Sequence, residues 1–363
     1  MSVADTSVQH YLSAMSGAPS LTGSAGSIIS LIDTCITGFG TVTLASLTIA
    51  GNVATGVVST GHGFAMTDGK CGPVIAIAGA TPSGLNGKWR IASIPNSTTF
   101  TFTTSGINDQ TASGTITAKI AGLSGWSKLY SGTNLAVYQR TTSGATAMLM
   151  SIDDTNAAYA IVTMYEAMSG VSIGTGASGV VYLTKSINGD SRPYRLFANG
   201  KTLHLFTNND SAAWYGNTTF GDINSYVNND AYGCLLIGAA SPAYPTGGSI
   251  VQVNGDTSAA YLSRAYSQLG TAIACGRYSH RRSAICGDGG IMNLSPNPVS
   301  NKIHLWPIEC WDATSYARGL IPGLYNPLNA LSDGAVISGV NGNPALYQAL
   351  SIYRIIVDMV GPW

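Results

Sequence analysis

Two neighbouring aspartates, Asp153 and Asp154, are of a type and spacing that could support chemistry. Paired carboxylates can ligate a cation or divide general acid and base roles between them. The surrounding SIDDTNAAY follows an apolar run and more simply predicts a polar strand end with an Asx turn. His62 lies between two glycines in GHGF with no acidic or nucleophilic partner nearby in the sequence. We therefore expect His62 to be a turn residue.

The chain has one cluster of basic side chains, in the segment CGRYSHRRSAICGDGG. Arg277, His280, Arg281 and Arg282 could bind an anion, a carboxylate-rich partner or nucleic acid there. In a chain without net charge, such a cluster more often forms a salt-bridged loop or a subunit contact. We expect an anion or subunit contact at these four residues.

Carboxylate and amide oxygens around Asp222, Asp230 and NNDAYG could supply ligands to calcium, but no loop has EF-hand spacing. The sequence also has no GxSxG, Walker A or HExxH motif. These patterns predict a protein that is not an enzyme and has no catalytic residues, no cofactor and no metal site.

The six cysteines form no CxxC pair, so we expect buried small apolar side chains. A bridge between Cys275 and Cys286 remains open and would need an oxidising setting.

The low charge of the chain limits its partners. Charged residues make up 9% of the 363 residues, and 17 basic side chains balance 17 acidic ones, whereas about 25% is usual. Such a surface does not attract nucleic acid or an anionic membrane. No run of apolar residues is long enough for a membrane-spanning helix, and the N-terminus does not resemble a secretory signal. A near-neutral surface also lacks the repulsion that keeps monomers apart, so we expect self-association.

The hydrophobic pattern divides the chain into three parts. Residues 1–40 carry apolar residues at helical spacing in SVQHYLSAM and AGSIISLIDTCI, which predicts a helical arm with one or two short helices. The arm could dock onto a neighbouring subunit or pack on its own domain. Residues 41–121 alternate in short runs separated by turn residues, which predicts a small β-barrel or sandwich. Residues 122–363 continue as a larger, sandwich-like β domain. The expected fold class is mainly β.

Several segments resemble proteins of tailed-bacteriophage particles. The block GHGF…GATPSGLNGKWRIASIPNSTTFTF…GINDQTASGTITAK resembles a small β module of many virion proteins. Distant similarity sometimes links that module to ubiquitin-activating enzymes, but this chain has no adenylate-forming domain. Further along, segments such as SGTNLAVYQR, DAYGCLLIG and RGLIPGLYNPL resemble a family of phage structural proteins. The resemblance implies a virion component with itself and other virion proteins as partners.

Two functions from different classes follow. The first is a self-associating virion protein of the head decoration, neck or collar, or tail accessory type. It is preferred because the chain lacks a fibre-like repeat. The alternative is a tail-tip or baseplate module that binds a receptor or a host surface glycan through aromatic residues in polar loops. Trp214, Tyr215 and Tyr244 are the candidates for that contact. A cell-wall hydrolase would need a carboxylate pair or a zinc set, and neither is visible.

Overall fold

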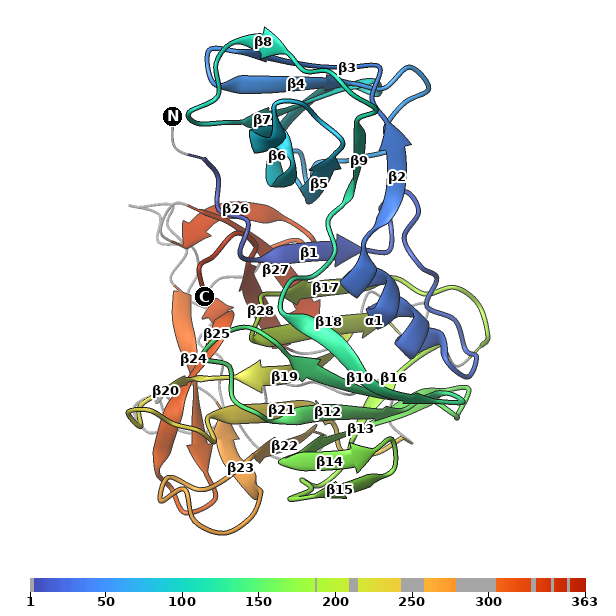
Figure 1. The fold of residues 1–363 in the computed structure, drawn as a ribbon. Helices are drawn as coiled ribbons and strands as arrows, with labels where there is room; N and C mark the ends of the chain where they lie inside the picture. The colour runs from blue at the N-terminus through green and yellow to red at the C-terminus, as the bar shows by residue number, and fades with distance from the viewer. Residues whose placement is uncertain are drawn as a thin grey trace.

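The computed structural model describes residues 3–186, 188–208, 215–242, 258–278, 305–327, 331–340, 343–350 and 353–363. Within these residues the chain is mainly β, with large antiparallel sheets and one α-helix, so the predicted fold class is confirmed (Figure 1). The smaller sheet lies at the top of the view, and the larger body of strands lies below it.

An eight-stranded sheet forms the smaller β module, in the order β2-β9-β5-β6-β7-β4-β3-β8. Its strands are β2 (Phe39–Thr43), β3 (Ser46–Ala50), β4 (Val53–Val57), β5 (Val74–Ala78), β6 (Gly87–Asn96), β7 (Thr99–Thr103), β8 (Gln110–Thr111) and β9 (Thr117–Ile120). One short 3-10 helix, η1 (Ser83–Leu85), precedes β6. The hairpin between β3 and β4 turns at Gly51 and Asn52, whose φ angles of 59° and 64° suit these two residue types. A Gly-Asn pair between two alternating runs is a local sequence signal for such a hairpin.

The larger body is a continuous network of antiparallel strands. Its first part contains β1 (Gln9–Leu12), β10 (Trp126–Gly132), β11 (Leu135–Arg140), β12 (Leu149–Asp153), β13 (Tyr159–Tyr165), β16 (Val181–Thr184), β17 (Tyr194–Ala198), β18 (Thr202–Asn208), β19 (Tyr215–Asp222), β20 (Asn224–Ser225) and β21 (Cys234–Ala239). Its second part contains β22 (Ser258–Leu262), β23 (Ile273–Tyr278), β24 (Leu305–Asp312), β25 (Ala317–Pro327), β26 (Val336–Val340), β27 (Asn343–Leu350) and β28 (Tyr353–Asp358). A separate ribbon pairs β14 (Ala167–Gly170) with β15 (Ile173–Thr175).

The N-terminal arm differs from the prediction at its first element. Residues expected to be helical form β1, which pairs antiparallel with β17. Gln9, His10 and Tyr11 are all buried, so the segment is covered on both faces, and its pairing partner lies far along the chain. Pairing with a distant strand therefore determines the structure of this segment, although its local spacing of apolar residues predicts a helix.

The second predicted helix is confirmed as α1 (Ser27–Thr37). Ile28, Leu31, Ile32 and Cys35 form its buried face, and Gly38 ends it with a φ of 79°. The residue before the helix is Gly26, whose φ of 80° lies in the left-handed region. The helix packs on its own chain, which was one of the two possibilities for the arm.

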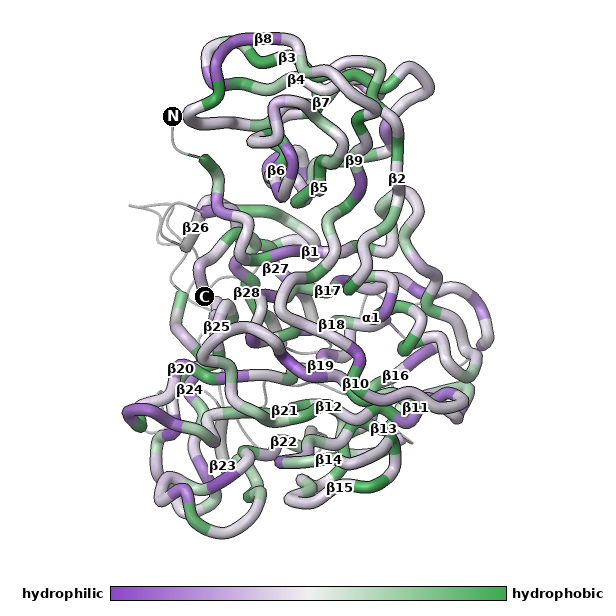
Figure 2. The backbone as a smooth tube through the Cα atoms, in the orientation of Figure 1, coloured by the Kyte–Doolittle hydropathy of each residue, from purple (hydrophilic) through white to green (hydrophobic). Residues whose placement is uncertain are grey.

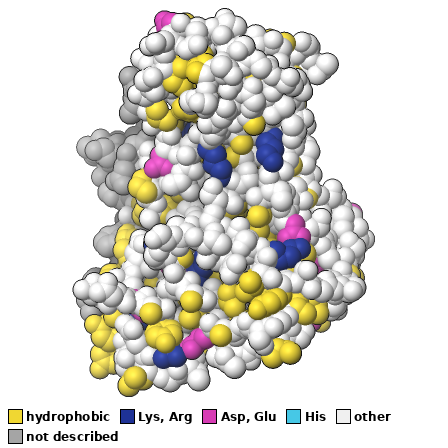
Figure 3. Space-filling model, viewed as in Figure 1, with side chains coloured by type: hydrophobic (Ala, Val, Ile, Leu, Met, Phe, Trp, Pro, Cys, Tyr) yellow, Lys and Arg dark blue, Asp and Glu magenta, His cyan; other side chains and the backbone are white. Residues whose placement is uncertain are grey.

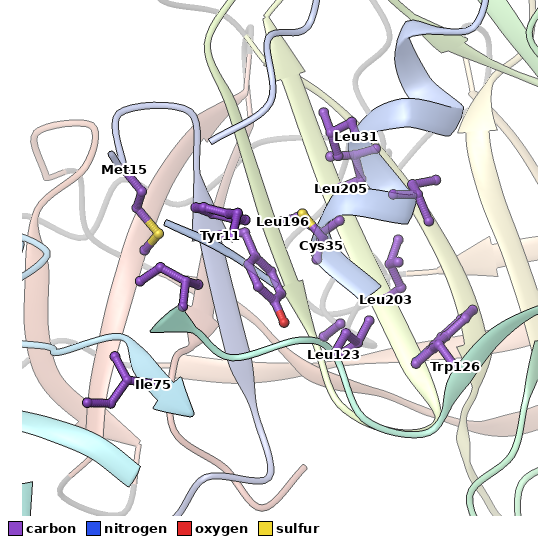
Figure 4. Packing of buried hydrophobic residues seen from close by; sticks show 14 of the residues in the cluster. Tyr11, Met15, Leu31, Cys35, Ile75, Leu123, Trp126, Leu196, Leu203 and Leu205 are labelled. Carbon is purple, nitrogen blue, oxygen red and sulfur yellow. The ribbon is translucent and has the colours of Figure 1, made fainter. Parts of the chain in front are cut away.

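One hydrophobic core joins α1, the smaller module and the larger body (Figure 4). Leu31 and Cys35 of α1 face Leu196, Leu203 and Leu205 of β17 and β18. The same core includes buried residues of the smaller module, such as Ile75 and Phe100. Because this core is shared, the arm and the two β parts stabilise one another. Along the backbone, strongly hydrophilic segments are short and separated (Figure 2).

Polar contacts also fix the smaller module to the N-terminal strand. The Lys88 ammonium donates to the Gln9 side chain at 2.8 Å, and the Tyr11 hydroxyl donates to the Ala121 carbonyl at 2.9 Å. Arg90 is buried and donates to the carbonyls of Asp5, Val8 and Gly72. Three cationic or hydroxyl side chains are therefore used to join segments within the chain.

Gly122 follows the smaller module in the chain and lies close to the backbone at the end of α1. A Cβ atom there would lie 2.3 Å from the Ile36 carbonyl oxygen and 3.0 Å from that of Thr37. We expect Gly122→Ala to lower the free energy of unfolding by about 1–3 kcal/mol, because backbone must shift. Gly84→Ala is the matched control, since its Cβ would meet only the Ile107 side chain at 3.7 Å. Urea unfolding would measure both, and equal stabilities of the two variants would contradict the prediction.

Candidate functional site

His62 is part of the scaffold of the smaller module. Gly61 and Gly63 beside it have φ angles of 91° and 66°, as a turn rich in glycine requires. The His62 ring is buried and stacks on Phe64 at 5.2 Å, and its Nδ1 accepts from the Phe64 amide at 2.9 Å. Its Nε2 faces the carbonyls of Asn96 and Thr99. The predicted turn histidine is confirmed.

Asp153 and Asp154 have different roles. Asp153 accepts from the amide and the hydroxyl of Thr155, which is the predicted Asx turn at the end of β12. Asp154 is fully buried, and its Oδ2 accepts from the amides of Ile28 and Ile29 at 2.8 and 3.1 Å. It therefore caps α1 from a distant part of the chain.

Lys185 completes the surroundings of Asp154. Its Nζ lies 2.6 Å from Asp154 Oδ1, and both side chains are fully buried. Nζ also donates to the carbonyls of Ser24 and Asn156. Burial raises the pKa of the Asp154 carboxyl, while Lys185 and the two amides act in the opposite direction. This arrangement is a structural ion pair, and its carboxylate does not face an open site.

Asp222 and Asp230 are also engaged by arginines. Asp222 Oδ1 lies 2.5 Å from Arg140 Nη1, and the Arg140 side chain is fully buried. Asp230 Oδ2 lies 2.7 Å from Arg318 Nη1, and that guanidinium is buried as well. The structure gives no support to calcium binding by these aspartates, because each carboxylate already has a cationic partner. Within the described residues no group of three or more His, Cys, Asp or Glu could hold a metal ion.

The prediction of buried cysteines agrees with the structure for five of the six, and Cys275 is one of these five. Cys35, Cys71, Cys234 and Cys310 are free and buried, and burial raises the pKa of each thiol. Raised thiol pKa values make these side chains unreactive. Cys275 lies in β23, but Cys286 falls outside the described residues, so a bridge between the two stays a prediction.

The aromatic candidates are only partly covered by the structure. Tyr215 begins β19, is 8% exposed, and packs under the Arg195 guanidinium at 4.7 Å from its ring centre. The expectation of an exposed loop position for Tyr215 is therefore wrong, because strand pairing with Asn208 of β18 extends through this polar run. Trp214 and Tyr244 lie outside the described residues.

The basic cluster is covered only at its first residue. Arg277 lies in β23, which pairs with β24. His280, Arg281 and Arg282 lie outside the described residues. The anion or subunit contact expected of these four residues stays a prediction.

A cleft of about 380 Å³ opens where several distant segments meet. Its walls come from the turn between β17 and β18, the end of β19 with β20, the loop after β11, and the end of the chain. The lining residues are Ser7, Thr142, Gly144, Thr146, Asn199, Gly200, Lys201, Thr202, Asp222, Ile223, Asn224, Ser225, Val227, Asp230, Gly233, Pro322, Pro362 and Trp363. Half of these residues carry short polar side chains.

Hydrogen bonds fix the cleft walls. Asp222 accepts from the Thr146 amide and hydroxyl as well as from Arg140. Asp230 accepts from the Ser225 hydroxyl and the Tyr232 amide, and its Oδ2 forms an ion pair with Arg318. Two lining carboxylates are thus held in place by buried guanidinium groups behind them, which makes the cleft a preformed site.

Exposed aromatic and aliphatic side chains form a second feature, at the tips of two loops. Tyr266 and Tyr316 stack at 5.5 Å with an interplanar angle of 23°. Tyr316 is 58% exposed, and Leu269 in the same loop as Tyr266 is 76% exposed. We call Tyr266, Leu269 and Tyr316 the tyrosine patch. No local sequence signal indicates it, because the two tyrosines meet only through the loops that β23 and β24 bring together.

The comparisons with known proteins add no family assignment. No family model matches the chain, and no curated protein matches it. Within the described residues no helix is long and apolar enough to cross a membrane.

Proposed function

We propose that this chain is a structural component of a tailed-phage particle, of the head decoration, neck or collar, or tail accessory type. It self-associates in multiple copies and contacts other virion proteins. The proposal assigns no catalytic activity. The observation that supports it concerns the charged side chains: the chain has few of them, and many of these form contacts within the chain.

Ion pairs within the chain account for much of this internal use. Eight ion pairs occur among the described residues, so they engage eight of the 17 basic and eight of the 17 acidic side chains of the sequence. Three of these pairs are almost fully buried, those of Arg140, Lys185 and Arg318. Lys88 and Arg90 bond to groups inside the chain as well. The surface therefore carries even less free charge than the composition indicates.

Hydrophobic side chains are exposed on this weakly charged surface. Charged side chains are scattered on the visible face, and hydrophobic ones gather over its lower part, where Figure 1 shows β14, β15 and β23 (Figure 3). Leu269 of the tyrosine patch and Ile173 of β15 are 76% and 67% exposed. Low charge with exposed apolar groups favours association between copies and with neighbouring proteins.

Location in the particle is the direct test. We expect immunogold labelling with antibody to this chain to mark purified phage particles, and mass spectrometry of the particles to give multiple copies. Label at the head, neck or tail tube would support the decoration, collar or accessory role. Absence of the chain from purified particles would overturn the proposal.

The tyrosine patch allows a test of self-association in the purified chain. We expect Leu269→Glu to shift the sedimentation distribution toward the monomer, because it places a charge in an exposed apolar contact. Stability should change by less than about 0.5 kcal/mol, since the side chain is mostly outside the core. Ser105→Glu is the matched control, at an exposed bend of the smaller module. Equal sedimentation of wild type and both variants would count against the patch as a contact surface.

The second candidate function is a tail-tip or baseplate module that binds a receptor or glycan. The cleft favours it, because its lining combines short polar side chains with one indole. Gold label confined to the tail tip would support this candidate over the first.

A further inference from the structure

We infer that the cleft lined by Asn199, Lys201, Asp222, Asp230 and Trp363 is a saccharide-binding site that prefers a sugar unit carrying a carboxylate. Such a site rests on the second candidate function, whose ligand class it names. It does not depend on the assembly role, because it concerns what a single folded chain binds.

The size and chemistry of the cleft suit a small hydroxyl-rich ligand. Its volume of about 380 Å³ lies at the lower end of the range of roughly 300–1,000 Å³ usual for small-molecule sites. Hydroxyls of Thr142, Thr146 and Ser225 and the amide side chains of Asn199 and Asn224 line it. Hydroxyl and amide groups both donate and accept, as sugar hydroxyls do. Thr146, Ser225 and Asn199 already bond within the protein, so a ligand would meet their remaining donor and acceptor positions.

One of the two lining carboxylates, that of Asp222, remains able to accept from a ligand. A carboxylate offers about four acceptor positions. Asp222 receives contacts from Arg140 Nη1, the Thr146 amide and the Thr146 hydroxyl. Asp230 accepts from the Ser225 hydroxyl and the Tyr232 amide and forms an ion pair with Arg318, and its side chain is only 3% exposed. Asp222 therefore keeps an acceptor position for a sugar hydroxyl, in an orientation fixed by its protein partners, whereas Asp230 supports the wall of the cleft.

Trp363 supplies apolar surface to the same cleft. Its indole N–H donates to the Asp358 carbonyl at 3.0 Å, so carbon atoms are what the ring offers to a ligand. The ring is held between neighbours: the centres of the His204 and Trp363 rings lie 5.0 Å apart, and a Cβ on Gly323 would lie 2.3 Å from Trp363 Cε2. An indole held in this way is a rigid surface for the C–H face of a sugar ring.

Lys201 gives the expected preference for a carboxylate. Its Nζ donates to the Gly144 carbonyl at 3.0 Å, and no ion pair engages it among the described residues. Asp222 and Asp230 are neutralised by Arg140 and Arg318, so Lys201 leaves the cleft with one surplus positive charge. A carboxylate on the ligand would complete this charge with a charge-assisted hydrogen bond.

Titration calorimetry and ligand-observed NMR on the purified chain would test the inference with methyl β-glucuronide, methyl β-glucoside and acetate as probes. We expect the glucuronide to bind at least about fivefold more tightly than the glucoside, and acetate to bind more weakly than either. Lys201→Met should remove the difference between the two glycosides. Asn224→Asp, at the exposed rim, should weaken the glucuronide selectively by adding a negative charge. Lys119→Met is the matched control, because that lysine bonds to the Thr37 carbonyl away from the cleft.

Three results would contradict the proposed site. Failure of both glycosides to bind the folded wild-type chain would overturn the saccharide site, wherever the chain is located in the particle. Equal affinity of the two glycosides, unchanged by Lys201→Met, would overturn the carboxylate preference. Binding of acetate as strong as that of the glucuronide would show an anion site without sugar recognition, which also contradicts the inference.

Discussion

Lys185→Met is expected to lower the free energy of unfolding by about 3–5 kcal/mol, the largest effect that we expect of a single substitution. The substitution removes the only cation bonded to Asp154 Oδ1 among the described residues and leaves that carboxylate fully buried. It also leaves the carbonyls of Ser24 and Asn156 without their ammonium donor. Urea unfolding followed by tryptophan fluorescence would measure the loss.

Two further variants separate the charge effect from a general packing effect. Lys119→Met makes the same change at a partly exposed lysine and should cost less than about 1 kcal/mol. Asp154→Asn combined with Lys185→Met leaves no buried charge, and an amide oxygen can still accept from the Ile28 amide. The double variant should therefore be more stable than Lys185→Met alone. A double variant that is less stable would show that packing and not the unpaired carboxylate dominates.

The sequence predicted those elements that depend on local signals. The hairpin at Gly51 and Asn52 needs only two residues with positive φ between alternating strands. The helix α1 needs only an apolar face at helical spacing and Gly38 at its end. The Asx turn at Asp153 is equally local. Each of these could be deduced because the residues that stabilise it are neighbours in the chain.

Features made by distant segments could not be deduced in this way. The local pattern at β1 predicts a helix, because the pairing of this strand with β17 leaves no trace in that pattern. The cap of α1 comes from Asp154, which directly follows the end of β12. The cleft joins a turn near Lys201, the end of β19 and the last residues of the chain. One sequence without its fold does not indicate which of many polar residues will meet.

Acidification from pH 6.5 to 4.5 is expected to destabilise the fold through two buried histidines. Burial lowers the pKa of His204 to about 4, and burial with the nearby Arg90 charge lowers that of His10 to about 3. In the unfolded chain both would titrate near 6.5. Between these values the unfolded chain binds protons that the folded chain does not, so stability is complete above about pH 6.5 and is lost as the pH falls.

The magnitude is substantial because both rings are almost completely buried. For His204 the pKa falls from 6.5 in the unfolded chain to about 4 in the folded chain. This difference lowers the free energy of unfolding by about 3 kcal/mol once the pH reaches the pKa of the folded chain. The groups that contact His204 are uncharged: the Thr219 hydroxyl, the Pro322 carbonyl and the Trp363 ring. No counter-charge in these contacts favours the imidazolium, so the ring stays neutral while the fold persists.

Comparison of variants isolates this effect from the carboxyl groups. Burial raises the pKa of Asp358 and hydrogen bonding to Arg264 lowers that of Glu166, so the carboxyl groups act in opposite directions at lower pH. As the pH falls from 6.5 to 4.5, we expect the free energy of unfolding of the wild type to decrease. The slope of this decrease with pH should correspond to about two protons taken up on unfolding. His204→Gln and His10→Gln should each reduce that slope by about one proton, and the double variant should be nearly flat. Equal slopes in the wild type and both single variants would mean that these histidines take up protons without unfolding, and the neutral buried imidazole would then be the wrong description of both.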